Sequence, residues 1–170
     1  SPVYWFTDKP EIILVAQAVA VGLSGLVAYS IGRKLVKNGI VRAALLTSYL
    51  GFVGLQNALY TDVHNIVFAL LPLMLALRAF YEKKWKQYWI FLILSVGWQE
   101  NLALVAVGLG IFMLLRKDRQ VKIGLYTICF GVIYGIIAMK LIIPFFRGNT
   151  YAYQPEWPRT WYEWLTRFIV

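Results

Sequence analysis

The stretch that decides the fold is residues 88–116, YWIFLILSVGWQENLALVAVGLGIFMLLR. It is apolar toward both ends but places Gln99, Glu100 and Asn101 near its middle. A single helix of this length would rise roughly 40 Å, which exceeds the roughly 30 Å hydrocarbon core of a bilayer. The stretch therefore has to tilt, bend or turn back, and which of these it does depends on the solvent around the chain.

The composition of the chain identifies that solvent. Hydrophobic residues make up 60% of the sequence and charged residues only 15%, and the mean hydropathy is +0.63. This balance is too apolar for an ordinary soluble domain and is typical of integral membrane proteins. The formal net charge of +9 does not indicate nucleic acid binding, because the basic residues form short clusters between apolar runs. We therefore expect an all-α, polytopic transmembrane helical bundle.

Four further apolar runs are long enough to cross a membrane as helices, for which about 20 residues are needed. Spans are expected over about 11–32, 41–60, 63–81 and 123–146. Each must be helical, because backbone in lipid has to satisfy its own hydrogen bonds. Residues 1–170 are expected to form one transmembrane domain, and the unfinished pattern at both ends suggests a segment of a longer protein.

Charge bias predicts how the stretch 88–116 lies in the bilayer. Positive charge in short loops marks the cytoplasmic side. Twelve of the 17 basic residues occupy the connections that follow the first span, the third span and the stretch itself: Arg33, Lys34, Lys37, Arg42, Arg78, Lys83, Lys84, Lys86, Arg116, Lys117, Arg119 and Lys122. The stretch therefore starts and finishes on that side. We predict a re-entrant hairpin of two short helices, about 88–98 and 101–116, with Glu100 at its tip.

The same topology sends several polar side chains to the outer side of the membrane. Asp62 and His64 lie between the second and third spans, and Lys140 and Arg147 lie near the end of the last span. An ionisable group within a span is costly and usually faces a partner or a pathway. Asp62, His64 and Glu100 together suit a divalent cation such as Mg²⁺ or Mn²⁺. Lys140 and Arg147 suit a lipid phosphate.

Each of these residues also has a simpler explanation. Glu100 could reach interfacial water, where a carboxylate costs little, and Asp62 could cap the helix that follows it. Lys140 and Arg147 could extend their side chains to lipid headgroups, and Pro144 could kink the helix between them. The sequence leaves these alternatives open.

Aromatic residues dominate the segment after the last span. Tyr151 and Tyr153 could stack on sugar rings, although tyrosine and tryptophan also form belts at membrane interfaces. Residues 156–170 alternate aromatic and charged side chains, which indicates an interfacial helix or the start of a further span. Motifs of nucleotide hydrolysis, dinucleotide binding and zinc proteolysis are absent from the sequence.

Small residues within the apolar runs bear on helix packing. Gly22 and Gly25, and likewise Gly108 and Gly110, are small enough to let helices approach closely. Cys129 has no second cysteine in the chain with which to form a disulfide.

Three blocks of the chain resemble, in order, those of a known protein family. They are YTDVHNIVFALLPLMLAL at 60–77, WQENLALVAVGLGIFMLLRK at 98–117 and IIPFFRGNTYAY at 142–153. The chain resembles a prokaryotic family of predicted membrane proteins of unknown function that is grouped with the polytopic C-type glycosyltransferases, which use lipid carriers. The resemblance implies a GT-C-like fold, a site that opens outward and a location in a prokaryotic inner membrane.

The resemblance extends to individual positions but also shows departures. Asp62 and His64 match the family's Asp and His before the third span, and Glu100 matches the acid of a Lys-Glu-Asp-like turn. Gln99 and Asn101 stand where the family tends to have Lys and Asp. The catalytic aspartate that such enzymes carry after their first span would lie upstream of Ser1.

The resemblance implies transfer of a sugar from a polyprenyl-phosphate donor to an acceptor on the outer face. Glu100 and Asp62 would then orient substrate or bind a cation, and His64 would relay a proton or bind the cation. The residues expected to contact substrate are Lys140, Arg147, Gln99, Asn101, Tyr151 and Tyr153. The alternative is a non-catalytic scaffold or accessory subunit of a larger membrane complex, suggested by the neutral residues beside Glu100. Membrane lipids are expected partners in either case.

Overall fold

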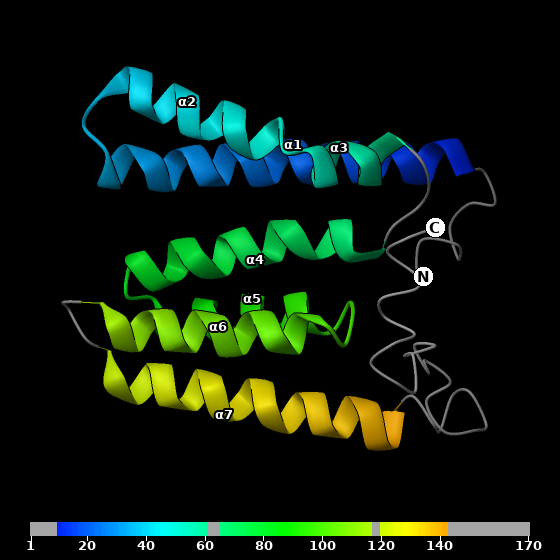
Figure 1. Cartoon of the computed structure of the whole chain (residues 1–170), viewed down its shortest axis with the longest axis vertical. Coiled ribbons are helices and arrows are strands. Elements are labelled where there is room, and N and C mark those ends of the chain that lie inside the picture. Colours follow the sequence, from blue (N-terminus) through cyan, green and yellow to red (C-terminus); the bar gives the residue numbers. More distant parts are fainter. Residues whose placement is uncertain (1–9, 61–64, 117–119, 143–170) are drawn as a thin grey trace, which may run out of the picture.

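Helices make up all the secondary structure of the computed structural model within the residues that the structure describes, 10–60, 65–116 and 120–142. In chain order they are α1 (Pro10–Leu35), α2 (Gly39–Leu50), α3 (Val53–Tyr60), α4 (Asn65–Tyr81), α5 (Trp85–Val96), α6 (Leu102–Leu115), α7 (Val121–Ile137) and η2 (Ala138–Ile142), a π-helical continuation of α7. Their axes run side by side, and the direction alternates from one helix to the next, except that α3 continues in the direction of α2 and η2 in that of α7 (Figure 1). The all-α fold predicted from the sequence is confirmed.

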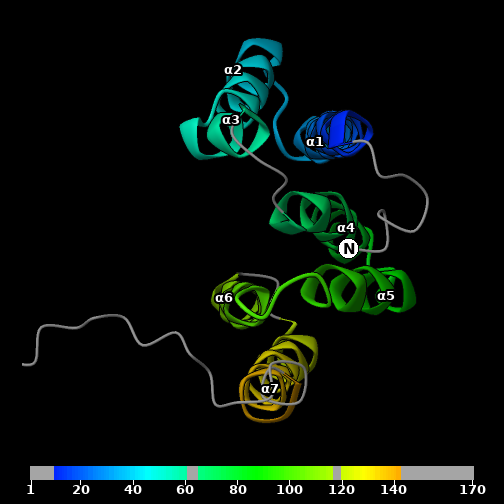
Figure 2. The ribbon, with the colours of Figure 1, turned by 90° about the vertical axis from the view of Figure 1, so that its right-hand side faces the viewer.

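The helices form an open row. The main contacts join α2 to α1, α1 to α4, α4 to α5 and α6 to α7. Seen along the helices, α4 lies between α1 and the α5–α6 pair, and α7 forms the edge farthest from α2 and α3 (Figure 2). The element that carries Glu100, the turn between α5 and α6, therefore lies between α4 and α7.

Apolar side chains cover the outside of this row as well as its interior. Ile12–Leu35 and Val121–Ile142 are long and apolar enough to cross a membrane, and α2, α4 and α6 contain shorter apolar helices. Leu26 is 65% exposed, Leu104 72% and Ile133 57%. A continuous apolar surface of this kind is stable in lipid rather than in water.

The stretch 41–60, expected as one span, is two helices in the structure. α2 ends at Leu50 and α3 begins at Val53. The Leu50 carbonyl, left open at the end of α2, accepts a hydrogen bond of 2.6 Å from the Gln56 side-chain amide. The backbone amides of Leu55 and Gln56 both donate to the Phe52 carbonyl and start α3. The break is thus closed by hydrogen bonds within the segment itself.

The two short helices predicted within 88–116 are present as α5 and α6. They run antiparallel and are joined by a turn at 97–101 (Figure 1). With 12 and 14 residues, they rise about 18 and 21 Å, which is less than a hydrocarbon core of about 30 Å. The helix-turn-helix is therefore observed, and its re-entrant position in a membrane remains a prediction.

Hydroxyl groups join helices across the apolar interior. The Ser24 Oγ and Tyr49 hydroxyl lie 2.8 Å apart and link α1 to α2. The Tyr88 hydroxyl and Thr127 Oγ1 lie 2.9 Å apart and link α5 to α7. Hydrogen bonds of this type hold helices together where hydrophobic burial alone provides little driving force. The surrounding core consists of Ala69, Ala76, Ala79, Phe80, Leu92, Val96, Leu102, Ala106 and Met113.

α6 and α7 approach so closely that glycine is required at their contact. A Cβ added at Gly110 would lie 2.7 Å from the Gly124 carbonyl oxygen, and one at Gly131 would lie 2.8 Å from the Ala103 carbonyl oxygen. Gly108, on the same helix as Gly110, has no atom within 4 Å of such a Cβ. The backbones of α6 and α7 therefore touch on one face of α6 only.

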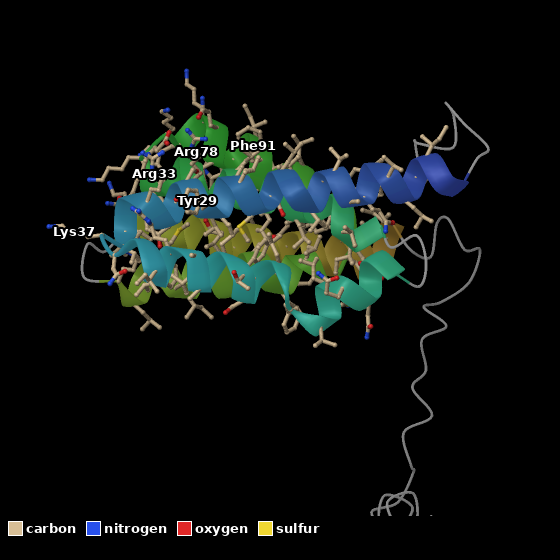
Figure 3. The ribbon with its side chains drawn as sticks, turned by 90° about the horizontal axis from the view of Figure 1, so that it is seen from above. Tyr29, Arg33, Lys37, Arg78 and Phe91 are labelled. Carbon is tan, nitrogen blue, oxygen red and sulfur yellow. The ribbon has the colours of Figure 1, made fainter. Side chains whose placement is uncertain are left out.

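Basic side chains gather at one end of the helices, which we call the basic end. Apart from Lys140, it holds every lysine and arginine whose side chain the structure describes: Arg33, Lys34, Lys37, Arg42, Arg78, Lys83, Lys84, Lys86, Arg116 and Lys122. Figure 3 labels three of them, which lie toward the same end of the bundle. The turn at 97–101, the start of α4 and the end of η2 lie at the opposite end, the turn end (Figure 1).

The α6–α7 contact predicts different effects for two neighbouring glycines. Gly110→Ala is expected to lower the free energy of unfolding by about 1–3 kcal/mol, because the added methyl group must push two backbones apart. Gly108→Ala is the control on the same helix and should leave stability unchanged or raise it slightly, since alanine favours helix. Thermal unfolding of the purified protein in detergent, followed by circular dichroism, measures both. Equal melting temperatures for the two variants would contradict the contact.

Candidate functional site

Backbone groups of the turn 97–101 satisfy the start of α6. The amides of Leu102, Ala103 and Leu104 donate to the carbonyls of Gln99, Glu100 and Asn101 at 3.1, 3.0 and 3.2 Å. Asn101 is the N-cap residue, yet its side chain makes no capping hydrogen bond. Asparagine is a common N-cap residue, but the Asn101 side chain does not cap α6 and is free of that role.

Two contacts anchor this turn on the first part of α4. The buried Ser95 Oγ donates to the Ala69 carbonyl at 3.2 Å. The Trp98 ring stacks on the Phe68 ring, with centroids 5.3 Å apart and an interplanar angle of 22°. Phe68 follows the first residue of α4, Asn65, by three positions. The turn is thus held beside the helix start that directly follows His64 in the sequence.

On its other side the turn approaches α7. Ala103 packs on Gly131 and Gly135, since a Cβ at Gly135 would lie 3.4 Å from the Ala103 Cβ. Glu100 and Tyr134 are close enough to interact electrostatically. Glu100 also directly precedes the start of α6, where the helix dipole favours negative charge. The turn that carries Glu100 therefore lies at a junction of α4, α6 and α7.

Lys140 lies farther along the helix that carries Tyr134. It is exposed and belongs to η2. Lys140 follows Tyr134 by six residues, which corresponds to a rise of about 9 Å along the helix toward the turn end. Single π-helical turns are rare and often occur at functional sites. Over Ala138–Ile142 the helix is π-helical, whereas Arg147 lies outside the described residues.

The structure describes some of the predicted site residues and not others. Gln99 and Glu100 are half-buried and Asn101 is exposed. The predicted residues outside the described ranges are Asp62, His64, Arg147, Tyr151 and Tyr153. Within the described residues, no three His, Cys, Asp or Glu side chains come together. Of the three predicted cation ligands only Glu100 is described, so the cation site remains a prediction.

Three residues of this junction were not anticipated: Phe68, Trp98 and Tyr134. Two of them had a local signal, because Trp98 directly precedes Gln99 and Phe68 lies one helical turn after His64. Tyr134 had no local signal, since its electrostatic interaction with Glu100 follows from the packing of α6 on α7.

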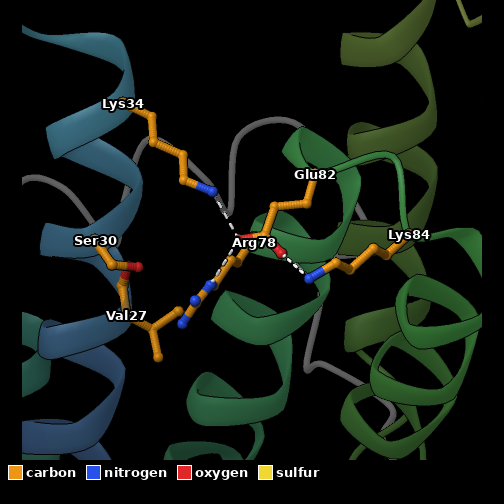
Figure 4. A network of polar contacts seen from close by, with 6 residues as sticks. All are labelled: Val27, Ser30, Lys34, Arg78, Glu82 and Lys84. Atoms are coloured by element: carbon orange, nitrogen blue, oxygen red, sulfur yellow. Dashed lines mark hydrogen bonds and ion pairs between the residues drawn. The ribbon is translucent and has the colours of Figure 1, made fainter.

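A separate polar cluster forms around Glu82 at the basic end. The Lys34 Nζ and Arg78 Nε lie 2.7 and 3.0 Å from the Glu82 Oε1, and the Lys84 Nζ lies 2.6 Å from its Oε2. The cations come from α1, from α4 and from the loop before α5 (Figure 4). The Glu82 side chain is only 13% exposed. The Lys34 ammonium, aided by Lys84 and Arg78, holds the pKa of the Glu82 carboxyl well below its usual range.

Alternating apolar helices, an apolar exterior and basic residues gathered at one end define a helical membrane protein. The chain belongs to the family described as Predicted membrane protein (DUF2079), whose model matches residues 1–161. No curated protein and no solved structure matches the chain. The membership confirms the family resemblance seen in the three sequence blocks, and the relation to glycosyltransferases remains a prediction.

The Glu82 cluster predicts a pH-dependent contribution to stability. Because folding lowers the pKa of Glu82, the contribution is complete above the unfolded value of about 4.3 and is lost as the pH falls toward the lower folded value. Glu82→Gln should lower the melting temperature by about 2–4 °C at pH 7, as a loss of about 1 kcal/mol would in a chain of this size. The gap between the variant and the natural protein should narrow as the pH falls below about 4. A gap that stays constant from pH 7 to pH 3 would refute the assignment.

Proposed function

We propose that the protein transfers a sugar from a polyprenyl-phosphate donor to an acceptor on the outer face of a prokaryotic inner membrane. One observation carries the proposal. A carboxylate, Glu100, lies in a turn between two helices that are each too short to cross a bilayer, at the end opposite the basic end. Such a position is costly for a structural residue and is typical of a functional one.

In this proposal the basic end faces the cytoplasm, as positive charge in short loops does. α6 rises about 21 Å from that side, so the turn 97–101 enters the outer half of the hydrocarbon layer as a re-entrant hairpin. Irregular backbone at that depth requires protein or water around it. The contacts of Trp98 with Phe68 and of Ala103 with α7 supply such protein surroundings.

The chemistry assigned to the site is nucleophilic substitution at the anomeric carbon. The acceptor hydroxyl oxygen forms a bond to this carbon while a carboxylate, Glu100 or Asp62, accepts its proton. The bond from the anomeric carbon to the phosphate oxygen breaks, and its electron pair leaves with the polyprenyl phosphate. His64 relays a proton or helps to bind a cation, and Lys140 holds the leaving phosphate.

The remaining predicted residues position the substrates. Gln99 and Asn101 offer amide groups for hydrogen bonds to the donor, and Arg147 offers a second cation for its phosphate. Tyr151 and Tyr153 offer rings for stacking on sugar. A divalent cation such as Mg²⁺ or Mn²⁺, held by Asp62, His64 and Glu100, would offset negative charge on the phosphate when bound. The fold in this proposal is GT-C-like.

Glu100→Gln in the full-length protein tests the proposal. It keeps the size of the side chain but removes its charge and its ability to accept a proton, so sugar transfer should fall about 100-fold or more. Lys86→Gln, which removes a charge from the opposite end of the same hairpin, should leave transfer unchanged. The measurement is release of labelled sugar from its polyprenyl-phosphate carrier, with melting temperatures as a check on folding. Unchanged transfer in Glu100→Gln would remove this residue from the mechanism.

The neutral Gln99 and Asn101 favour a second candidate function, a scaffold in a larger membrane complex. They remove one charge of each sign from the family's Lys-Glu-Asp-like turn. Gentle purification followed by mass spectrometry distinguishes the two functions. Bound polyprenyl phosphate supports the transferase, whereas a stoichiometric membrane partner without bound carrier supports the scaffold.

A further inference from the structure

We propose that a groove between α1, α4 and α6 binds an anionic phospholipid, with an acyl chain in the groove and the phosphate at the basic end. The groove measures about 600 Å³. Its walls include Ala28 and Ile31 of α1, Leu77 and Tyr81 of α4, and Gly108 and Phe112 of α6. Apart from the Tyr81 hydroxyl, these side chains offer only apolar surface, which suits a hydrocarbon chain.

One end of this groove is covered by a cation. The Arg116 guanidinium lies 4.9 Å from the Tyr81 ring centroid and 5.9 Å from that of Phe112. Tyr81 also lines a second, small cavity of about 30 Å³ together with Lys83, Arg116 and Gln120. An apolar groove and a polar cavity thus meet at Tyr81. An apolar groove that leads to a polar, positively charged end suits a molecule with a hydrocarbon chain and a charged head group.

The side chains next to Tyr81, where the groove and the cavity meet, carry a net positive charge. Glu82 directly follows Tyr81 and is contacted by three cations, Lys34, Arg78 and Lys84. Three positive charges against one negative charge leave a surplus of +2 in this cluster, and the cluster adjoins Lys83 in sequence. Surplus positive charge at a membrane surface attracts anionic lipids. A neutral lipid or an apolar helix would fill the groove but leave this charge unmatched.

The backbone at Lys83 adds to the argument. Lys83 has a φ of 56°. Its amide donates to the Phe80 carbonyl and the Lys84 amide donates to the Ala79 carbonyl, which together form a Schellman motif at the end of α4. Glycine is the usual residue at this position, because a side chain strains the backbone at positive φ. The chain nevertheless has a lysine here, and this lysine is one of the residues that line the small cavity.

A larger side chain in the groove tests whether the groove binds the acyl chain of the lipid. Gly108→Leu should weaken phosphatidylglycerol binding to the delipidated full-length protein by about tenfold, as the loss of about two buried methylene groups would. A Cβ at Gly108 meets no atom within 4 Å, so the added side chain starts in open space and extends into the groove that Gly108 lines. Gly22→Leu is the matched control, since Gly22 has the same free space on α1 and does not line the groove. Native mass spectrometry in detergent measures binding, and melting temperatures confirm that both variants fold.

Charge variants test the binding of the phosphate and separate it from stability. Lys83→Gly should weaken phosphatidylglycerol binding about fivefold and raise the melting temperature, because glycine suits the positive φ. Glu82→Gln should do the reverse, since it raises the surplus charge of the cluster while removing its ion pairs. Phosphatidylethanolamine, which has no net charge, should bind more weakly than phosphatidylglycerol to the natural protein.

Three results would overturn the proposal. One is equal binding of phosphatidylglycerol and phosphatidylethanolamine. Another is unchanged phosphatidylglycerol binding in Gly108→Leu. The third is capture of a protein helix rather than lipid by a photo-crosslinking amino acid at position 108 in native membranes. None of these outcomes bears on sugar transfer, so the groove and the proposed function succeed or fail separately.

Discussion

The close approach of α6 and α7 is the interaction on which the rest of the structure depends. With Gly110, Gly124 and Gly131 in the interface, the two backbones meet without intervening side chains. α6 is too short and too evenly apolar to be oriented by its own pattern of side chains. The contact fixes its rotation and thereby sets Ala103 against α7 and brings Glu100 within electrostatic range of Tyr134. The same rotation leaves Gly108 and Phe112 facing the groove.

Two polar anchors lie at opposite ends of the part of the molecule that the structure describes. At the turn end, Ser95 and the Trp98 ring fasten the turn to α4. At the basic end, a single carboxylate, Glu82, connects α1, α4 and the loop before α5. Both anchors converge on α4, which packs on α1 and α5. α4 therefore fixes the positions of its neighbours at both ends of the molecule.

Helices and their order could be predicted from the sequence, because length, hydropathy and loop charge are local properties. The two helices within 88–116 were predicted to within about three residues for this reason. The break after Leu50 was missed, since it depends on a hydrogen bond from the Gln56 side chain. Gly108 and Gly110 could not be told apart, because only the rotation of α6 decides which one meets α7. The contact of Lys34 with Glu82 joins residues 48 apart, a separation at which no local pattern remains. Of the predicted site, the structure supports the placement of Glu100 in a turn and describes Lys140, while Asp62 and His64 lie outside the described residues.

The order of contacts along the row also bears on biosynthesis. α1 packs on α2, α4 on α5 and α6 on α7, so most helices find their partner in the segment that leaves the ribosome directly before or after them. Contacts between near neighbours in the chain carry a small entropic penalty and form early. The contact of α1 with α4 and the hydrogen bond between Tyr88 of α5 and Thr127 of α7 must wait for the intervening helices. Assembly during translation should therefore proceed by pairs, and the docking of α4 on α1, sealed by Glu82, is the step that joins the first pair to the rest.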